Sequence, residues 1–525
     1  MLQSPAQPAR PSESVSRIIG HYRRLGQKDA LDVALKMVAG DVSKDVSKLL
    51  EGLQPAWADY AVASVYAALM EKGQRKKLGA YFTPPGLVDY LIARAGSMGV
   101  ELSSQRVRDP AAGGAAFIVP IAREMVRRWR DEKLSDAKII ARLQKQLMGR
   151  EIESGLAKLA NALLRRCLVD EYGFAPSTVS ALSLISQGDT LAIAKDSGAD
   201  HELGNPPFLR LAARDEPEDF VRFDDISSGR LNLYAVFVRR GLEALPANGI
   251  LAYIIPASFI GGPEFRKFRL RLRQLADVLA VDMINGRSTV FTNVVQDTCV
   301  LVLRKRPKEV PSFKSSWASS NAVSGDGSVA SEGRIKLPAG DEAWMLPGAK
   351  VDLPSTLADW GYVPRIGYLV ANRQSDRLHD RPAKGRVPLI WAKSIGQDGK
   401  FDFAKGVELR KHGWVDVPDG APYVATQACV AIQRTSSRNQ KKRITAAAIP
   451  AEFVAKHGGV VAENHVILLI PTGPGAASPD DLASALNRQD VSEQMDRMCG
   501  SASIPARLLA GMAMPARPRP SSKLP

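Results

Sequence analysis

Cysteines are few in this sequence, and no apolar run is long. The four cysteines of the 525-residue chain are Cys167, Cys299, Cys429 and Cys499, which lie far apart and show no CxxC spacing. This pattern excludes a disulfide scaffold and, without histidines at metal-ligand intervals, a typical zinc site. The longest apolar run, residues 249–262, contains a proline and is shorter than the roughly 20 residues that a membrane helix needs. The N-terminus lacks the apolar core of a signal peptide. We therefore expect a cytoplasmic protein with reduced cysteines, no membrane segment and no metal.

Positive charge is in excess. The chain carries 71 Lys and Arg against 55 Asp and Glu, a formal net charge of +16 at pH 7. Its 45% hydrophobic and 24% charged residues are typical of a soluble globular protein, and its length predicts two or three domains of about 150 residues each. The excess indicates a polyanionic partner such as nucleic acid, although a merely soluble basic protein has the same composition.

Hydrophobic patterning divides the chain. From about residue 105, short apolar runs alternate with helical stretches of about 10–15 residues, which predicts a doubly wound α/β sheet of parallel strands. Before this region, apolar residues recur at the three- and four-residue spacing of helices, and after it come short strand-like runs. The expected divisions are a disordered N-terminus (1–16), a helical N-terminal region (17–75), an α/β domain (76–310), a linker or mobile loop (311–335), a mixed, strand-rich domain (336–511) and a disordered tail (512–525).

The most distinctive motif is Gly204-Asn205-Pro206-Pro207-Phe208, which follows a predicted strand. The two prolines fix φ and have no N–H, so they hold the Asn205 amide and the adjacent carbonyl in one orientation. These two oxygens form an acceptor pair that matches the two donors of an exocyclic amino group, and Phe208 offers a ring for stacking on a flat base. An ordinary turn explains the motif as well, since Asn-Pro and Pro-Pro are common in loops.

Three acidic residues lie where successive strands are predicted to end. Asp109 begins a turn of small residues, including Ala111 and Gly113, that leads into a helix, and Glu151 and Asp189 end the next two strands. Such a turn is typical of a cofactor site, because small residues let a ligand approach the backbone. The acids can accept an amino group, two ribose hydroxyls and an adenine amino group respectively, although each alone also suits a helix N-cap or a loop. Their order favours one shared site, because strand ends line the ligand crevice of such sheets.

These motifs resemble those of the N6-adenine DNA methyltransferases that use S-adenosylmethionine. Residues 204–208 are similar to the family's catalytic (N/D/S)PP(Y/F/W) motif, and DPAAGGAAF at 109–117 to its cofactor motif DPACGSGxF. GAYFTPP at 79–85 and the stretch 231–260 are similar to two further family segments. The order of the motifs resembles the TaqI-like γ class over about 75–305. The C-terminal half resembles stand-alone type II modification methylases of the PstI/BsuBI kind. The resemblance makes 76–310 the catalytic domain and 336–511 the target-recognition domain.

The resemblance implies roles in cofactor binding. Thr83 and Asp109 would contact the methionine part of S-adenosylmethionine, with Ala111 and Gly113 in the adjoining turn. Glu151 would bind the ribose, Asp189 would bind the adenine, and Phe237 would pack against the adenine ring. The chain departs from the family at Ala112, where Cys is frequent, and at Gly114-Ala115, which replaces Ser-Gly. These replacements remain small, so we expect binding to survive.

The resemblance also implies catalytic roles. Asn205 and Pro206 would accept hydrogen bonds from the target amino group, with Pro207 and Phe208 completing the motif. Phe208 and Phe291 would sandwich a base that has left the duplex.

Basic residues are candidates for DNA contact. In the acid-free stretch 431–450 they are Arg434, Arg438, Lys441, Lys442 and Arg443. This stretch is loop-like and rich in Ser and Thr, which suits phosphate contacts. A second basic cluster at 266–273 suits a solvated helix face equally well.

The resemblance implies a site-specific DNA methyltransferase that acts on double-stranded DNA as the modification component of a restriction-modification system. Its cognate restriction endonuclease would be encoded separately, and it would associate with the nucleoid of a bacterial or archaeal cell. The alternatives are methylation of N4-cytosine, RNA or a protein amide, a fused restriction–modification protein, and a non-catalytic DNA-binding protein on the same fold.

Overall fold

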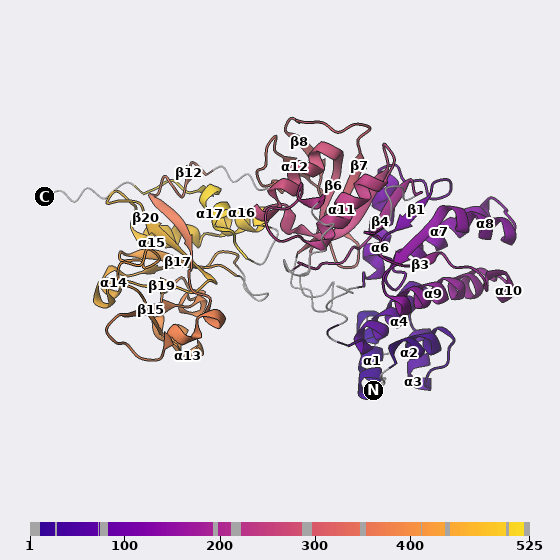
Figure 1. Cartoon of the computed structure of the whole chain (residues 1–525), viewed down its shortest axis with the longest axis horizontal. Helices are drawn as coiled ribbons and strands as arrows, with labels where there is room; N and C mark the ends of the chain where they lie inside the picture. Colours follow the sequence, from indigo (N-terminus) through magenta and orange to yellow (C-terminus); the bar gives the residue numbers. More distant parts are fainter. Residues whose placement is uncertain are drawn as a thin grey trace, which may run out of the picture. The chain divides into compact units, whose positions relative to one another are not determined.

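The computed structural model describes residues 11–26, 29–71, 73, 82–192, 198–211, 222–285, 297–346, 353–410, 412–435, 442–499 and 503–518. The chain forms two compact units (Figure 1). The first comprises Met1–Ala257, Arg266–Ile335 and Ala339–Asp341, and the second comprises Ser258–Phe265, Lys336–Pro338 and Glu342–Pro525. Each unit is described by itself below.

A large twisted sheet is the centre of the first unit. Its strands run in the order β10-β9-β6-β7-β5-β4-β1-β2-β3. The bounds are β1 (Val107–Asp109), β2 (Leu147–Glu151), β3 (Ile185–Gln187), β4 (His201–Gly204), β5 (Ile250–Pro256), β6 (Ala276–Ile284), β7 (Thr298–Lys305), β8 (Ser316–Ser319), β9 (Ala322–Val323) and β10 (Val329–Ser331). Strands β3, β2, β1, β4 and β5 are parallel neighbours, and β7 runs antiparallel between β5 and β6. The predicted α/β sheet is therefore confirmed.

The strand order reverses between β1 and β4. From β1 the chain proceeds to β2 and β3 on one side, and then returns to place β4 and β5 on the other side. In open α/β sheets, ligands bind outside the carboxyl ends of the strands at such a reversal. Asp109 ends β1 and Asn205 follows β4, so the two principal sequence motifs meet at this point.

Helices cover both faces of the sheet, as the alternation along β5 shows. Ile250, Ala252 and Ile254 belong to the core formed with α6, α7 and α9. Tyr253 and Leu251 face α11 instead, because a Cβ on Gly241 of α11 would touch both side chains. The helices are α6 (Pro85–Ser97), α7 (Ile118–Asp131), α8 (Asp136–Gln146), α9 (Ser154–Tyr172), α10 (Pro176–Val179), α11 (Leu233–Ala244) and α12 (Arg266–Leu275).

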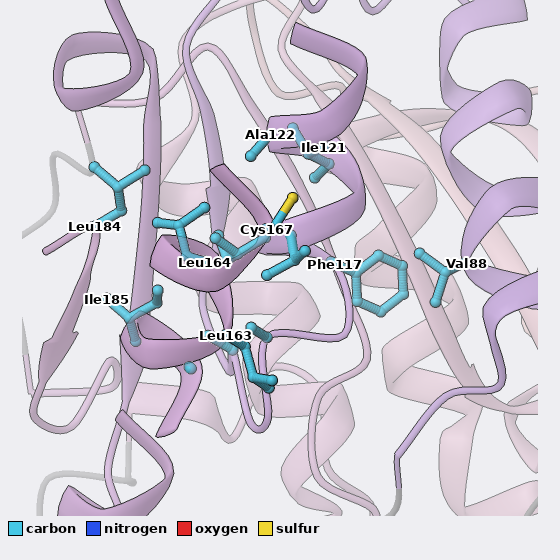
Figure 2. Packing of buried hydrophobic residues seen from close by; sticks show 14 of the residues in the cluster. Val88, Phe117, Ile121, Ala122, Leu163, Leu164, Cys167, Leu184 and Ile185 are labelled. Atoms are coloured by element: carbon cyan, nitrogen blue, oxygen red, sulfur yellow. The ribbon is translucent and has the colours of Figure 1, made fainter. Parts of the chain in front are cut away.

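The N-terminal helices share the core of the sheet unit. They are α1 (Pro11–Arg24), α2 (Ala30–Val38), α3 (Lys44–Glu51) and α4 (Pro55–Leu69), and their buried residues join the same cluster as those of α6, α7 and α9. Figure 2 shows part of this cluster, with Cys167 of α9 beside Ile121 and Ala122 of α7. Burial raises the pKa of the Cys167 thiol, so Cys167 has the environment of a packing residue.

The second unit is mixed and rich in short strands. Its sheets have the orders β13-β20-β17-β18, β14-β16-β15-β19 and β12-β21. The strands are β12 (Ser355–Thr356), β13 (Tyr362–Ile366), β14 (Leu378–His379), β15 (Arg386–Ile390), β16 (Trp414–Asp416), β17 (Cys429–Gln433), β18 (Ala446–Ile449), β19 (Val461–Ala462), β20 (Val466–Pro471) and β21 (Ala513–Met514). The helices are α13 (Phe403–Arg410), α14 (Ala451–His457), α15 (Pro479–Leu486), α16 (Gln489–Cys499) and α17 (Ala506–Gly511). The strand-rich C-terminal region is as predicted.

Three segments differ from their predicted character. The Ser- and Gly-rich stretch 311–335, expected to be a linker or mobile loop, instead contains β8, β9 and β10, and β9 extends the large sheet beside β6. Residues 11–16 of the expected disordered N-terminus begin α1, and residues 513–514 of the expected tail form β21. Edge pairing overrides local composition in the first case, because β-propensity depends strongly on context. Among the described helices, none has both the length and the apolar character needed to cross a membrane.

Candidate active site

Asp109 lies at the carboxyl end of β1, where its side chain passes over β4. The carboxylate is only 1% exposed, and its Oδ1 accepts a hydrogen bond from the Ala111 N–H at 3.1 Å. A Cβ on Gly204 would lie 2.6 Å from that same oxygen. Glycine at 204 therefore allows the carboxylate to approach the strand that carries the Asn-Pro-Pro-Phe motif, and the two motifs are in direct contact.

The electrostatic surroundings of Asp109 favour its protonated form. Burial is the main cause, and the nearby Glu151 and Glu202 carboxylates add to it, so that the pKa of Asp109 is raised to about 8. Arg108 opposes this shift, but its guanidinium is paired with Glu202, which also accepts from the Tyr253 hydroxyl. A cation brought to Asp109 would stabilise the ionised carboxylate and displace its proton.

Glu151 lies beside the turn that follows β1. Its Oε2 accepts from the Gly113 N–H at 2.8 Å, and its Oε1 accepts from the Glu153 N–H at 2.9 Å. The Ala112 N–H donates to the carbonyl of Arg150 at 2.9 Å, which ties the same turn to β2. Burial raises the pKa of Glu151, while the two N–H donors lower it. Asp109, Gly113 and Glu151 therefore lie close together around this turn, and their role in one cofactor site stays a prediction.

Asp189 is exposed just beyond β3, and its Oδ1 accepts from the Leu191 N–H at 2.8 Å. The next residue, Thr190, donates its hydroxyl to the Pro110 carbonyl at 2.5 Å, and the Gly188 N–H donates to the Glu151 carbonyl at 2.8 Å. These bonds join the end of β3 to the ends of β1 and β2. The three predicted acids thus lie at adjacent strand ends.

Asn205 follows β4, and its amide is held by Thr83. The Asn205 Nδ2 donates to the Thr83 Oγ1 at 3.0 Å, and Thr83 is buried two residues before α6 begins. With Nδ2 directed at Thr83, the orientation of the Oδ1 acceptor is determined. Pro206 is buried, and Phe208 is half-buried against the core that α6 and α7 share. The contact joins the Thr-Pro-Pro and Asn-Pro-Pro-Phe motifs, a pairing that the family resemblance did not imply.

Of the two remaining aromatic candidates, Phe237 and Phe291, the structure describes only Phe237. Phe237 is buried one turn into α11. The start of this helix lies near the Asn-Pro-Pro-Phe motif, because the Leu233 N–H donates to the Leu209 carbonyl at 2.8 Å. Phe291 lies outside the described residues, so its stacking role stays a prediction.

Two features of the site were not found by sequence reasoning. Ile152, directly after Glu151, is a large apolar side chain that is 55% exposed. Its sequence signal is an apolar residue immediately following the acid at a strand end. The second feature is the pair of Tyr66 and Glu153, whose side chains are hydrogen-bonded at 2.7 Å. They are far apart in the sequence, and no local pattern indicates their contact.

The basic residues of 431–450 are not equivalent. Arg443 is 3% exposed and lies near Asp496, with its guanidinium Nε 3.6 Å from the carboxylate, so the prediction of a surface phosphate contact is wrong for this residue. Arg434 is half-buried and donates to the Asn464 carbonyl, and the Lys442 ammonium donates to the Asn487 carbonyl. DNA contact by these two stays a prediction, as it does for Arg438 and Lys441, which lie outside the described residues.

Three arginines of the second basic cluster, on α12, are not solvated, although Lys267 of this cluster is exposed. Arg269 and Arg273 are buried, and their guanidinium groups donate to the carbonyls of Asp341 and Lys314. Arg271 pairs with Asp225 at 2.8 Å and with Glu309. These three arginines therefore have partners within the fold. The described part of the chain contains no group of three or more His, Cys, Asp or Glu side chains placed to hold a metal ion.

Part of the chain is similar in sequence to known restriction-modification enzymes. Residues 158–291 match the Eco57I restriction-modification methylase family. The type II methyltransferase M.PstI of Providencia stuartii is 27% identical over 204 residues, which are 36% of this chain and 40% of that protein. M.BsuBI of Bacillus subtilis is 22% identical over 316 residues, 52% of this chain and 56% of that one. The chain therefore spans about half the length of these curated relatives.

Solved structures show the same fold at low sequence identity. The type IIL restriction-modification enzyme MmeI in complex with DNA aligns with a TM-score of 0.51 and 16% identity, over 89% of this chain and 72% of that chain. The DrdV–DNA complex aligns with a TM-score of 0.52 and 12% identity, over 81% of this chain and 53% of that chain. The sequence resemblance to type II restriction-modification methyltransferases is thus confirmed, and residues 158–291 are similar to the methylase domain of the Eco57I restriction-modification family.

Proposed function

We propose that the protein is a DNA methyltransferase of a restriction-modification system that transfers a methyl group from S-adenosylmethionine to the N6 amino group of adenine. The observation that carries this proposal is the contact between Asn205 and Thr83 beside Asp109, at the reversal of strand order. An amide acceptor with a fixed orientation is thereby held next to a carboxylate that lies in a turn of small residues.

The residues present suit S-adenosylmethionine. Asp109 is a buried carboxylate with a raised pKa and would gain from an ammonium group, as the methionine part of the cofactor provides. Glu151 offers acceptor oxygens at the next strand end, where they suit ribose hydroxyls, and Asp189 would accept from the adenine amino group. Ile152 would pack its exposed side chain on the adenine ring, opposite Phe237. When bound, the cofactor supplies an electrophilic methyl group on a sulfonium.

The catalytic motif would act by orientation. The target adenine must leave the duplex, because its amino group is otherwise paired. Asn205 Oδ1 and the Pro206 carbonyl would accept its two amino hydrogens and increase the electron density of the nitrogen lone pair. Thr83 keeps the Asn205 amide from rotating, so this acceptor is preorganised. Phe208 would support the base by stacking. Direct transfer requires no covalent bond to the protein.

Partners follow from this activity. Double-stranded DNA would be bound with the help of Arg434, Arg438, Lys441 and Lys442, and a cognate restriction endonuclease would be encoded separately. The second unit would read the target sequence. The net charge of +16 supports a polyanionic substrate.

The test is modification-sensitive sequencing of DNA from a methylation-free host that expresses the protein or its Asn205→Ala variant. N6-methyladenine at one short motif, absent with the variant, is the expected result. N4-methylcytosine in its place would refute the adenine assignment and retain the amino-group mechanism. An unreduced signal with Asn205→Ala would refute the catalytic role of Asn205. Loss of all signal in both strains, with cofactor binding intact in vitro, would point to an RNA or protein-amide substrate.

A further inference from the structure

Two backbone N–H groups fix the carboxylate of Glu151, one from each side. Gly113 donates to Oε2, and Glu153 donates to Oε1. A carboxylate has about four acceptor positions, so these bonds leave capacity for a ribose diol. Gly113 belongs to the turn after β1, whereas Glu153 is the residue before α9. The position of Glu151 therefore depends on how firmly Glu153 is held.

Glu153 is held as the N-cap of α9. It has an extended backbone, with φ −89° and ψ 121°, and its side chain accepts from the Gly155 N–H at 3.1 Å and the Leu156 N–H at 2.6 Å. Both bonds satisfy donors that a helix N-terminus leaves open, and the helix dipole favours the negative charge there. The cap thus determines the direction of the Glu153 N–H, which points to Glu151.

A third donor reaches the cap from the N-terminal helices. The hydroxyl of Tyr66, on α4, donates to the Glu153 Oε2 at 2.7 Å. Tyr66 is buried, and burial together with the Glu153 carboxylate raises the pKa of its phenol, so it remains a donor at neutral pH. A Cβ on Gly155 would lie 2.1 Å from the Tyr66 hydroxyl oxygen. The absence of a side chain at 155 is therefore what lets this hydroxyl reach the cap.

We infer that Tyr66 is a positioning residue of the cofactor site. Its hydroxyl fixes the Glu153 cap, and the N–H of Glu153 fixes the carboxylate of Glu151 toward the ribose. This rests on the proposed function, which assigns the ribose to Glu151. It also makes α4 part of the cofactor-binding unit, although α4 lies outside the predicted catalytic domain 76–310.

The experiment measures the Kd of two ligands, S-adenosylhomocysteine and its analogue without the 2′- and 3′-hydroxyls, for the full-length protein. Tyr66→Phe is expected to weaken the binding of S-adenosylhomocysteine by about threefold to tenfold, the effect of one hydrogen bond, and to leave the Kd of the analogue unchanged. The effect is modest because Gly155 and Leu156 still hold the cap. Tyr172→Phe is the matched control. It removes a phenol that donates to the Arg123 carbonyl at 2.9 Å, at the other end of α9, and should change neither Kd.

Two further variants separate the possible failures. Glu151→Gln should weaken the binding of S-adenosylhomocysteine and leave the Kd of the analogue unchanged. If it leaves both Kd values unchanged, the assignment of the ribose to Glu151 is wrong. If Glu151→Gln behaves as expected but Tyr66→Phe leaves both Kd values unchanged, Tyr66 does not position Glu151. Equal weakening of both ligands by Tyr66→Phe would likewise overturn the inference, since it would indicate a general packing role. Gly155→Ala displaces the hydroxyl while keeping the tyrosine, and should reproduce the selective loss.

Discussion

Binding of the cofactor should release a proton from Asp109, and the affinity should therefore depend on pH. Burial, with the Glu151 and Glu202 carboxylates, raises the pKa of Asp109 to about 8, so at pH 7 roughly one tenth of the molecules carry the ionised form. Only this form pairs with the ammonium group of the ligand. Because the binding-competent state is a minor population, Kd should fall by up to about tenfold for each pH unit between pH 5.5 and 7.

Isothermal titration calorimetry with S-adenosylhomocysteine, in buffers of different ionisation enthalpy, measures both Kd and the protons released. We expect release of close to one proton at pH 6.5, where the ligand's amino group is still protonated. In Asp109→Asn the release should disappear, and affinity at pH 7 should fall by about 10- to 100-fold through loss of a charge-assisted hydrogen bond. Asp189→Asn is the control, because its carboxylate is exposed and its loss should leave the proton release unchanged. A Kd independent of pH, with no proton released by the wild type, would refute this account of Asp109.

Three further predictions concern the supports of the site. Thr83→Val removes the acceptor that orients Asn205 and should slow single-turnover methyl transfer by about threefold to tenfold, with Thr83→Ser near wild type; equal losses would contradict the orientation role. Ala115 has φ 62° in the turn after β1, so Ala115→Gly should raise the free energy of unfolding by up to about 1 kcal/mol in urea denaturation, and a lower free energy of unfolding would contradict this account of backbone strain. Asp282 is fully buried and accepts hydrogen bonds from Arg94 and Tyr90 of α6, so Asp282→Ala should lower the free energy of unfolding by about 3–5 kcal/mol. Asp277 lies on the same strand but forms an exposed ion pair with Arg306, so Asp277→Ala should lower it by less than about 1 kcal/mol.

The sheet could be predicted because its signals are local. Strand β5 is a continuous apolar run, and all its residues are buried, as a strand between two helical layers requires. Helix α9 ends at Tyr172 and is capped by Gly173, which has φ 69° and is a helix stop signal that can be read from the sequence. Strands β8–β10 could not be predicted, because their Ser- and Ala-rich residues become strands only by pairing at the sheet edge.

The candidate site was predictable to the extent that strand ends converge. Asp109 and Glu151 each end a strand and Asp189 lies just beyond one, and the topology then brings them together without any local signal of contact. The bond from Asn205 to Thr83 required the position of α6 against β4, which depends on tertiary packing. The burial of Arg443 was missed for the same reason, since a basic run in sequence does not reveal that one member turns toward Asp496.

The domain boundary predicted at residue 76 falls inside the sheet unit, and the contacts of α4 show why. This helix, PAWADYAVASVYAAL, carries a single charge, Asp59, and Tyr66 follows it at seven residues, which is two helical turns and places both on one face. Asp59 pairs with Arg123 of α7 at 2.5 Å and with Arg166 of α9, while Tyr66 reaches the cap of α9. A lone acid in an otherwise apolar helix indicates a charge that is satisfied by another element, because an unpaired buried carboxylate is costly. A chain truncated at residue 76 would leave two arginines without this partner and expose the apolar face that α4 covers. The compact sheet unit therefore extends at least to Pro55, the first residue of α4.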